Sequence, residues 1–324
     1  MSDLATRLAA LSPTKRALLE RTLAKDRAQR SLARARPPPP RGALEMTTSG
    51  EVLFALQPEG EARPFFCVHA VGGSAFSFLP LGAALALHRQ PLYAFQAVGL
   101  SGEAPVERRV EDMAATYIRA MRSAQPQGPY RVVGWCSGGS IAFEMARQLE
   151  GAGAGVEALV ILDTPAPVPG NPQAEGEDYG DDTAAWLAEL VRPIARFFKK
   201  DVPLEADLLR GLSHDEQLGL VLEGGKAMGI LPPSTGVRVI EGLLAVFRAQ
   251  MEAWREYRLK PYEGPLTLVR PSEKLRPEDE IDPELWRPYC GRLQLLWVPG
   301  DHHTMVQEPA VAETARALLA SVSS

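Results

Sequence analysis

Residues 130–140 read YRVVGWCSGGS, a short apolar run that ends in a cysteine flanked by glycines. The run predicts a buried strand, and the small residues after it predict a sharp turn into a helix. Gly134 and Gly138 suit a turn in which the two backbones approach too closely for a side chain. This pattern is typical of a nucleophile elbow, and the helix amino end would favour a Cys136 thiolate. Cys136 is therefore the candidate nucleophile, against the alternative of a buried, inert thiol.

Other short apolar runs recur along the chain without polar alternation, as in strands buried on both faces of a sheet. They occupy residues 65–69, 92–96, 158–162, 266–269 and 293–298. Helical patterns lie between them, at 110–124 and 140–150, so the sheet should be mostly parallel. Together with the elbow, this alternation predicts the α/β-hydrolase fold, in one domain from residue 43 to 324.

The one long gap between predicted strands runs from about residue 165 to 264. It begins with a stretch rich in glycine, proline and acidic residues and continues with helical patterns at 183–198 and 239–257. A helical insertion at the carboxyl edge of the sheet would fit a lid over the substrate pocket.

The candidate base follows the last predicted strand, where residues 295–305 read LLWVPGDHHTM. His302 comes first after the turn and is the preferred base, with His303 as the alternative. A metal site is the other interpretation of a histidine pair, but neither an HExxH motif nor a third ligand accompanies these two. We therefore expect no metal.

A third residue should hold the imidazole by its Nδ1 proton, and a carboxylate at a strand end can do so. Asp163 ends the run ALVILDT at 158–164 and is the preferred candidate. The rival position follows the next strand, where a loop is crowded with carboxylates: Glu273, Glu278, Asp279 and Glu280.

An oxyanion hole is expected from two backbone N–H groups, one in a glycine-containing loop and one just after the nucleophile. The loop candidate is FCVHAVGGS at 66–74, and the two donors would be Val71 and Ser137. A plain turn at Gly72 and Gly73 is the alternative, since backbone donors leave little trace in a sequence.

The first 42 residues differ in composition from the rest of the chain. They carry a net charge of +7, whereas the remainder carries −12, and they end in a run of prolines. Ser12 and Pro13 predict a helix start, so we expect a helix over about 13–34 and then a stiff linker. Such a helix could dock on a partner protein or be a solvated tail. Nucleic-acid binding is disfavoured because this basic segment lacks aromatic residues for base stacking.

Composition excludes several other classes. No apolar run of about 18 residues and no secretory leader is found, so we expect neither a membrane span nor export, but a cytoplasmic location. The three cysteines, Cys67, Cys136 and Cys290, lack the spacing of a zinc site or a disulfide framework.

Taken in order, these motifs resemble the thioesterase domains of nonribosomal peptide and polyketide synthases. The likeness spans roughly residues 48–320 and rests on FCVHAVGG at 66–73, GWCSGG at 134–139, LDT at 162–164, GILPP at 229–233 and VPGDH at 298–302. It implies an acyl group delivered as a thioester on the phosphopantetheine arm of an acyl or peptidyl carrier protein, with no other cofactor. It also implies Asp163 as the triad acid and His302 as the base. LSPTKRALL at 11–19 looks like the helical segments that precede domains in such synthases, which implies a synthase subunit as partner for residues 1–36.

Two departures from this family widen the functional expectations. Cys136 stands where the family usually has serine, and residues 1–42 are too few to hold a carrier domain. The first hypothesis is product release by hydrolysis or cyclisation, with removal of wrongly loaded groups as a variant. The second is a shuttle that moves an acyl or aminoacyl group between carrier proteins through Cys136. The third is a hydrolase-fold binding protein without catalysis, which predicts a broken triad.

Overall fold

The computed structural model describes residues 51–175, 177–200, 202, 204–274 and 280–322. The predicted helix at 13–34 and the proline linker lie outside these residues. The described chain forms two compact units, residues 179–244 and residues 51–178 together with 245–322.

The larger unit contains a seven-stranded sheet in the order β1-β3-β2-β4-β5-β6-β7. All neighbours are parallel except β1, which runs antiparallel to β3. The mostly parallel sheet predicted from the apolar runs is therefore confirmed. The strands are β1 Leu53–Gln57, β2 Phe65–Val68, β3 Leu92–Phe95, β4 Tyr130–Trp135, β5 Val156–Leu162, β6 Tyr262–Pro271 and β7 Cys290–Val298.

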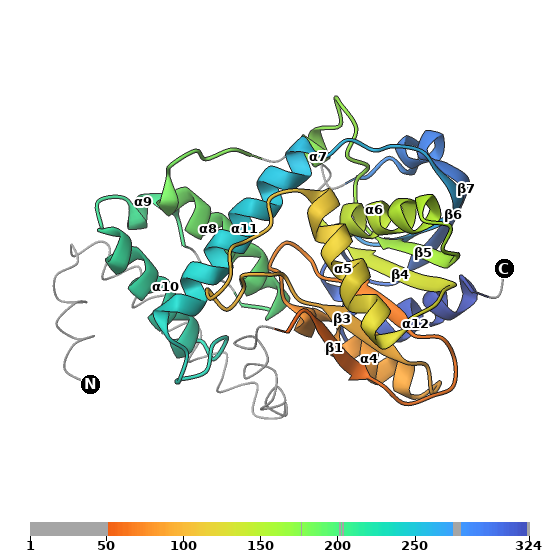
Figure 1. Ribbon diagram of the computed structural model, residues 1–324. Helices are drawn as coiled ribbons and strands as arrows, with labels where there is room; N and C mark the ends of the chain where they lie inside the picture. Colours follow the sequence, from red (N-terminus) through yellow and green to blue (C-terminus); the bar gives the residue numbers. More distant parts are fainter. Residues whose placement is uncertain (1–50, 176, 201, 203, 275–279, 323–324) are drawn as a thin grey trace. The chain divides into compact units, whose positions relative to one another are not determined.

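Helices cover both faces of this sheet (Figure 1). One face carries α5 Val110–Ala124 and α6 Gly138–Gly151, and the other carries α4 Leu79–Ala86 and α12 Val311–Ala320. The short helix α7 Pro172–Glu175 and three 3-10 helices, Ala75–Phe78, Pro283–Tyr289 and Thr304–Val306, complete the larger unit. A parallel sheet buried on both faces explains why its central strands are mainly apolar.

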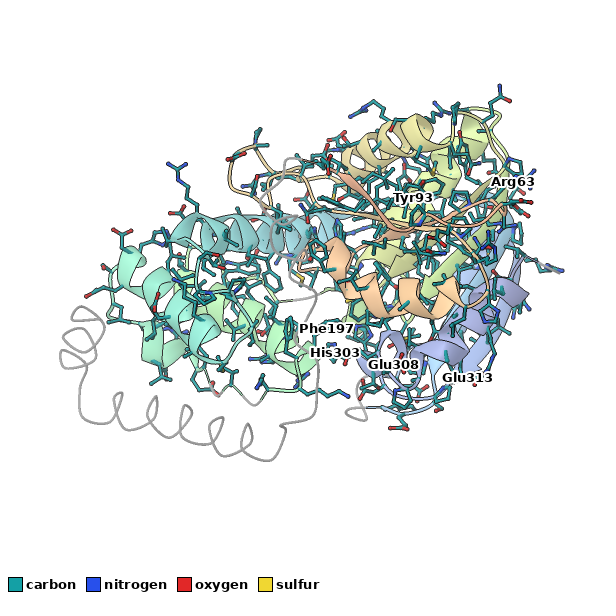
Figure 2. All side chains as sticks on the ribbon, turned by 90° about the horizontal axis from the view of Figure 1, so that it is seen from below. Arg63, Tyr93, Phe197, His303, Glu308 and Glu313 are labelled. Atoms are coloured by element: carbon teal, nitrogen blue, oxygen red, sulfur yellow. The ribbon has the colours of Figure 1, made fainter. Side chains whose placement is uncertain are left out.

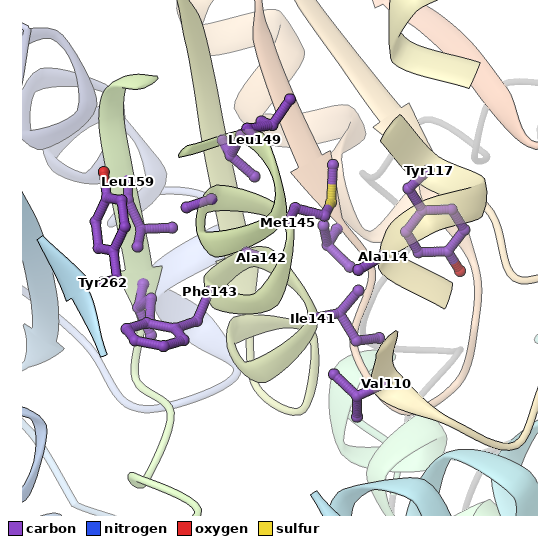
Figure 3. Packing of buried hydrophobic residues seen from close by; sticks show 14 of the residues in the cluster. Val110, Ala114, Tyr117, Ile141, Ala142, Phe143, Met145, Leu149, Leu159 and Tyr262 are labelled. Carbon is purple, nitrogen blue, oxygen red and sulfur yellow. The ribbon is translucent and has the colours of Figure 1, made fainter. Parts of the chain in front are cut away.

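The core of the larger unit is centred on α6 (Figure 3). Ile141 and Met145 face Val110 and Tyr117 of α5, while Phe143 faces the side of β6 that carries Tyr262 (Figure 3). Removing this apolar area from water stabilises the unit. Because α6 is packed on several sides, its first turn is held firmly, and that turn follows Cys136 directly.

The smaller unit is helical. It contains α8 Thr183–Phe197, α9 Ala206–Leu209, α10 His214–Ala227 and the first part of α11 Val237–Glu256. Asp182 caps α8, and Ser213 with Glu216 forms a capping box on α10. The unit is shorter than the predicted insertion at 165–264. Residues 163–178 and the second part of α11 belong to the sheet unit, where Tyr257 joins the core cluster. The lid role of these helices stays a prediction.

Candidate active site

The candidate site is built at the carboxyl ends of the parallel strands. β4 lies between β2 and β5, and β6 and β7 follow on the β5 side. The segments after β2, β4, β5 and β7 therefore reach the same edge of the sheet, as ligand sites in open α/β sheets do. These are the segments that hold Val71, Cys136, Asp163 and His302.

Cys136 occupies a strained turn between β4 and α6. Its φ is +57°, a backbone conformation that residues other than glycine rarely adopt. A Cβ on Gly134 would lie 2.3 Å from the carbonyl oxygen of Gly138, and a Cβ on Gly138 would lie 2.3 Å from that of His69. Both glycines are therefore required by close backbone approach, as the sequence predicted.

Hydrogen bonds to neighbouring strands hold this turn in place. The Cys136 N–H donates to the Leu162 carbonyl at 3.1 Å. The Thr164 hydroxyl donates to the Cys136 carbonyl at 2.6 Å, and Thr164 is fully buried. Strain at a special backbone conformation persists only where the surroundings enforce it, and Thr164 is part of that enforcement. Sequence reasoning missed this role, because a threonine after a strand carries no signal for it.

His302 lies in the loop after β7, and its ring is oriented by two contacts. Its Nδ1 lies 2.7 Å from Oδ2 of Asp163, and its Nε2 side is left for the hydrogen bond to Cys136. The Trp135 indole N–H donates to the His302 carbonyl at 3.1 Å, which ties the loop to the strand before the elbow. His303 stacks edge-on against His302 with 5.1 Å between ring centroids. The structure thus brings the preferred histidine to Asp163 and Cys136.

Asp163 is buried at the end of β5, in the place predicted for the acid. Of the rival carboxylates, Glu278 and Asp279 lie outside the described residues. Glu280 pairs with Lys274 instead. The second oxygen of Asp163 accepts a hydrogen bond at 2.8 Å from Nε of Arg270, a buried residue of β6 that sequence reasoning passed over.

The electrostatics favour a thiolate–imidazolium pair. Burial opposes ionisation of Cys136, but the charge and hydrogen bond of His302 and the Ser137 N–H outweigh it, so the pKa of Cys136 is lowered. Burial would lower the pKa of His302, but the charge of Cys136 and the hydrogen bond that His302 donates to Asp163 raise that pKa well above its usual value. The other two thiols behave oppositely, since burial raises the pKa of both Cys67 and Cys290. A lowered pKa is the property that activates a cysteine.

The expected oxyanion donors lie in the loop after β2, at Val71, and directly after the nucleophile, at Ser137. Val71 sits in a turn closed by a hydrogen bond of 2.9 Å from the Gly73 N–H to the Ala70 carbonyl. His69 braces this turn, because its ring nitrogens contact the Ala70 carbonyl at 2.9 Å and the Tyr117 hydroxyl at 2.5 Å. Burial lowers the pKa of His69 to about 4, so the ring is neutral at pH 7. The assignment of Val71 and Ser137 as oxyanion donors stays a prediction.

No helix among the described residues is long and apolar enough to cross a membrane. Nor does that part of the chain contain a group of three or more histidine, cysteine or acidic side chains able to hold a metal ion.

Comparison with known proteins relates this geometry to a family. The family model for the thioesterase domain matches residues 63–319. A dimodular nonribosomal peptide synthase of Bacillus subtilis is 28% identical over 283 residues, which are 85% of this chain and 11% of that protein. A four-domain nonribosomal peptide synthetase, crystallised with AMP and glycine, matches with a TM-score of 0.75 at 31% identity, over 83% of this chain and 20% of that one.

The NocB thioesterase domain, crystallised in covalent complex with a fluorophosphonate nocardicin G analogue, shares the fold. It matches with a TM-score of 0.57 at 22% identity, over 84% of this chain and all of that domain. The chain thus spans only a small part of the synthases it matches, whereas 84% of this chain covers the whole of the NocB thioesterase domain. Since the family model covers strands β2 to β7, the elbow and the histidine loop together, the chain belongs to the thioesterase domain family.

Proposed function

We propose that this protein takes an acyl group from the phosphopantetheine thioester of an acyl or peptidyl carrier protein onto Cys136 and releases it by hydrolysis or cyclisation. The observation that carries the proposal is the hydrogen-bonded row Cys136–His302–Asp163 at a strained elbow, with the pKa of the thiol lowered. The similarity to nonribosomal peptide synthases supports the carrier-bound substrate class. Contact of a synthase subunit with residues 1–36 is part of the proposal and rests on the sequence alone.

Acylation follows from the resting ion pair. The Cys136 thiolate attacks the thioester carbonyl carbon, and the oxyanion that forms accepts hydrogen bonds from the N–H groups of Val71 and Ser137. The intermediate collapses by breaking the bond to the pantetheine sulfur, which leaves as a thiol with the proton from Nε2 of His302. The Nδ1 proton stays on the imidazole throughout and is donated in a hydrogen bond to Asp163.

Deacylation reverses the proton movement. Once Cys136 is acylated, its negative charge is gone, and His302 is neutral and able to act as base. Water, or a nucleophile within the acyl chain, loses its proton to His302 as it attacks the carbonyl carbon. Cys136 then departs as a thiolate, which restores the ion pair.

A sulfur nucleophile also favours a second function, transfer of the acyl group to another carrier protein. A serine would form an oxygen ester, lower in free energy than the incoming thioester. Cys136 forms a second thioester of similar free energy, so loading is nearly reversible and the acyl group stays activated. A carrier thiol could then accept the group that an ester would retain.

Intact-protein mass spectrometry tests the proposal and separates its two forms. The enzyme is mixed with acyl-loaded carrier protein, and a second, empty carrier is added afterwards. An adduct on Cys136 followed by free acid or a cyclic product supports release, whereas label on the second carrier supports the shuttle. Neither adduct nor loss from the first carrier, over a panel of acyl groups, would overturn both.

Variants test whether acylation and release both depend on the sulfur of Cys136. Cys136→Ala should abolish the adduct and turnover. Cys136→Ser should still permit hydrolysis but impair return to a carrier thiol, because it forms an ester. Cys290→Ser is the matched control, since it removes a half-buried thiol whose pKa is raised and should change neither step.

A further inference from the structure

Arg270 is buried at the carboxyl end of β6, with 2% of its surface exposed. Its Nε lies 2.8 Å from Oδ1 of Asp163, while Oδ2 of the same carboxylate lies 2.7 Å from Nδ1 of His302. One oxygen of Asp163 is therefore paired with a permanent cation, and the other with a histidine that can be protonated. A buried carboxylate needs such partners, since its desolvation is otherwise costly.

The guanidinium of Arg270 is itself held from two further sides. One of its Nη1 hydrogens is donated to the Ile281 carbonyl. The group also lies over the ring of Trp297 on β7, with 5.7 Å from its central carbon to the ring centroid. A planar, permanently charged guanidinium fixed in this way presents Nε to Asp163 in one direction. It can therefore prevent rotation of the carboxylate away from His302.

We propose that Arg270 is a positioning residue that orients the Asp163 carboxylate toward His302 and limits how strongly that carboxylate retains the imidazolium proton. This inference rests on the proposed function and deepens it. Four alternating charges result, from Arg270 through Asp163 and His302 to the Cys136 thiolate. A fixed cation lowers the pKa of every group near it. Arg270 therefore assists acylation in two ways: it favours the Cys136 thiolate that attacks, and it favours transfer of the His302 proton to the leaving pantetheine sulfur.

Other charged groups around His302 do not take this role. Cys136 and Asp163 are its two direct partners, on the elbow and after β5. On its own loop, His303 faces its ring edge-on, and Asp301 is engaged by the backbone N–H groups of His303 and Thr304. None of these four groups is a permanent cation, whereas Arg270, which reaches His302 through Asp163, is one.

Alkylation of Cys136 by iodoacetamide tests the electrostatic part of the inference without any acyl substrate, and deacylation of the loaded enzyme tests the positioning part. The rate is measured against pH by peptide-resolved mass spectrometry, so that Cys67 and Cys290 are scored separately. The variants are Arg270→Gln, which removes the charge, and Arg270→Lys, which keeps it but loses the planar fork. Arg131→Gln is the matched control: Arg131 is a buried arginine of the same sheet, paired with Glu157 at 3.0 Å. The control pair is remote from the histidine loop, because Arg63, which contacts the same Glu157, lies on the far side of the unit from His303 (Figure 2).

We expect Arg270→Gln to move the inflection for Cys136 upward by roughly half to one pH unit, because the thiolate loses a stabilising cation. Arg270→Lys and Arg131→Gln should keep the wild-type inflection. Arg270→Lys should still deacylate more slowly, by about tenfold, because the carboxylate is less well oriented. Circular dichroism establishes which variants fold.

Each outcome decides the inference. An unchanged inflection in folded Arg270→Gln overturns the electrostatic part, and an equal shift in Arg270→Lys shows that packing and not charge is responsible. If Arg270→Gln does not fold, Arg270→Lys decides alone. The positioning role is supported if its Cys136 alkylation keeps the wild-type pH inflection while deacylation is slower. The role is overturned if Arg270→Lys deacylates at the wild-type rate. A wild-type Cys136 with the reactivity of an ordinary thiol refutes the proposed nucleophile instead, which is a different failure.

Discussion

The close approach of the elbow to β2 makes Gly138→Ala an informative perturbation. The new Cβ would lie 2.3 Å from the His69 carbonyl oxygen and 2.6 Å from that of Val68, both backbone atoms. Ordinary contact begins at 3.4 Å, so the strand, the loop or the helix start must move by about 1 Å. His69 leads directly into the loop that carries Val71. The displacement therefore separates the two expected oxyanion donors from each other.

A misplacement of this size costs on the order of a hundredfold in rate. We expect Gly138→Ala to slow formation of the Cys136 acyl-enzyme by about that factor and to destabilise the fold by about 1–3 kcal/mol through overpacking. Single-turnover acylation from a loaded carrier protein, followed by mass spectrometry, measures the first effect. Urea unfolding measures the second.

The control is Gly151→Ala at the other end of the same helix. A Cβ there meets nothing within 4 Å, and the residue is exposed. Acylation should be unchanged, and stability should rise by at most about 1 kcal/mol. If folded Gly138→Ala acylates at the rate of Gly151→Ala, the reasoning that backbone proximity positions the oxyanion donors is refuted.

Three further predictions concern the same unit. His302→Ala removes the charge and hydrogen bond that lower the pKa of Cys136, so iodoacetamide alkylation should need higher pH; unchanged alkylation at low pH would contradict the ion pair. Thr164→Val removes the 2.6 Å hydrogen bond to the elbow and should destabilise the protein by about 1–3 kcal/mol in urea unfolding, with slower acylation; full stability would show that the turn needs no such brace. Burial opposes ionisation of Glu144, but hydrogen bonds from Arg147, Gln148 and Tyr257 outweigh it and lower its pKa. Its contribution to stability is then present above the unfolded-state pKa and lost as pH falls through the folded pKa, so Glu144→Gln should flatten the acid side of a stability–pH curve measured by thermal unfolding.

Local pattern was sufficient to predict several parts of the fold and the site. Short, mainly apolar runs predicted six of the seven strands, because strands buried on both faces are mainly apolar. β7 was found by its apolar run at 293–298, although it is an edge strand in which only Val298 is buried. The elbow was readable because only glycine satisfies the close approach at 134 and 138. Asp163 and His302 could be nominated because residues after parallel strands reach a common edge.

Other parts depend on contacts between distant residues and were decided by tertiary structure. β1 was missed: in this edge strand only Phe54 and Gln57 are buried, which gives neither an alternating nor a fully buried pattern. Arg270 lies just beyond the apolar run predicted at 266–269, and its burial is accounted for by contacts with distant residues, above all Asp163, 107 positions away. The neighbourhood of His302, with Trp135 on its carbonyl and Asp163 on its ring, likewise arises from loops that meet only after the sheet has formed. The sequence alone thus determined which residues could react, because the type of each side chain and the turn that presents it depend only on neighbouring residues. The orientation and protonation of those residues were decided by the fold, because hydrogen bonds and burial between distant segments set both.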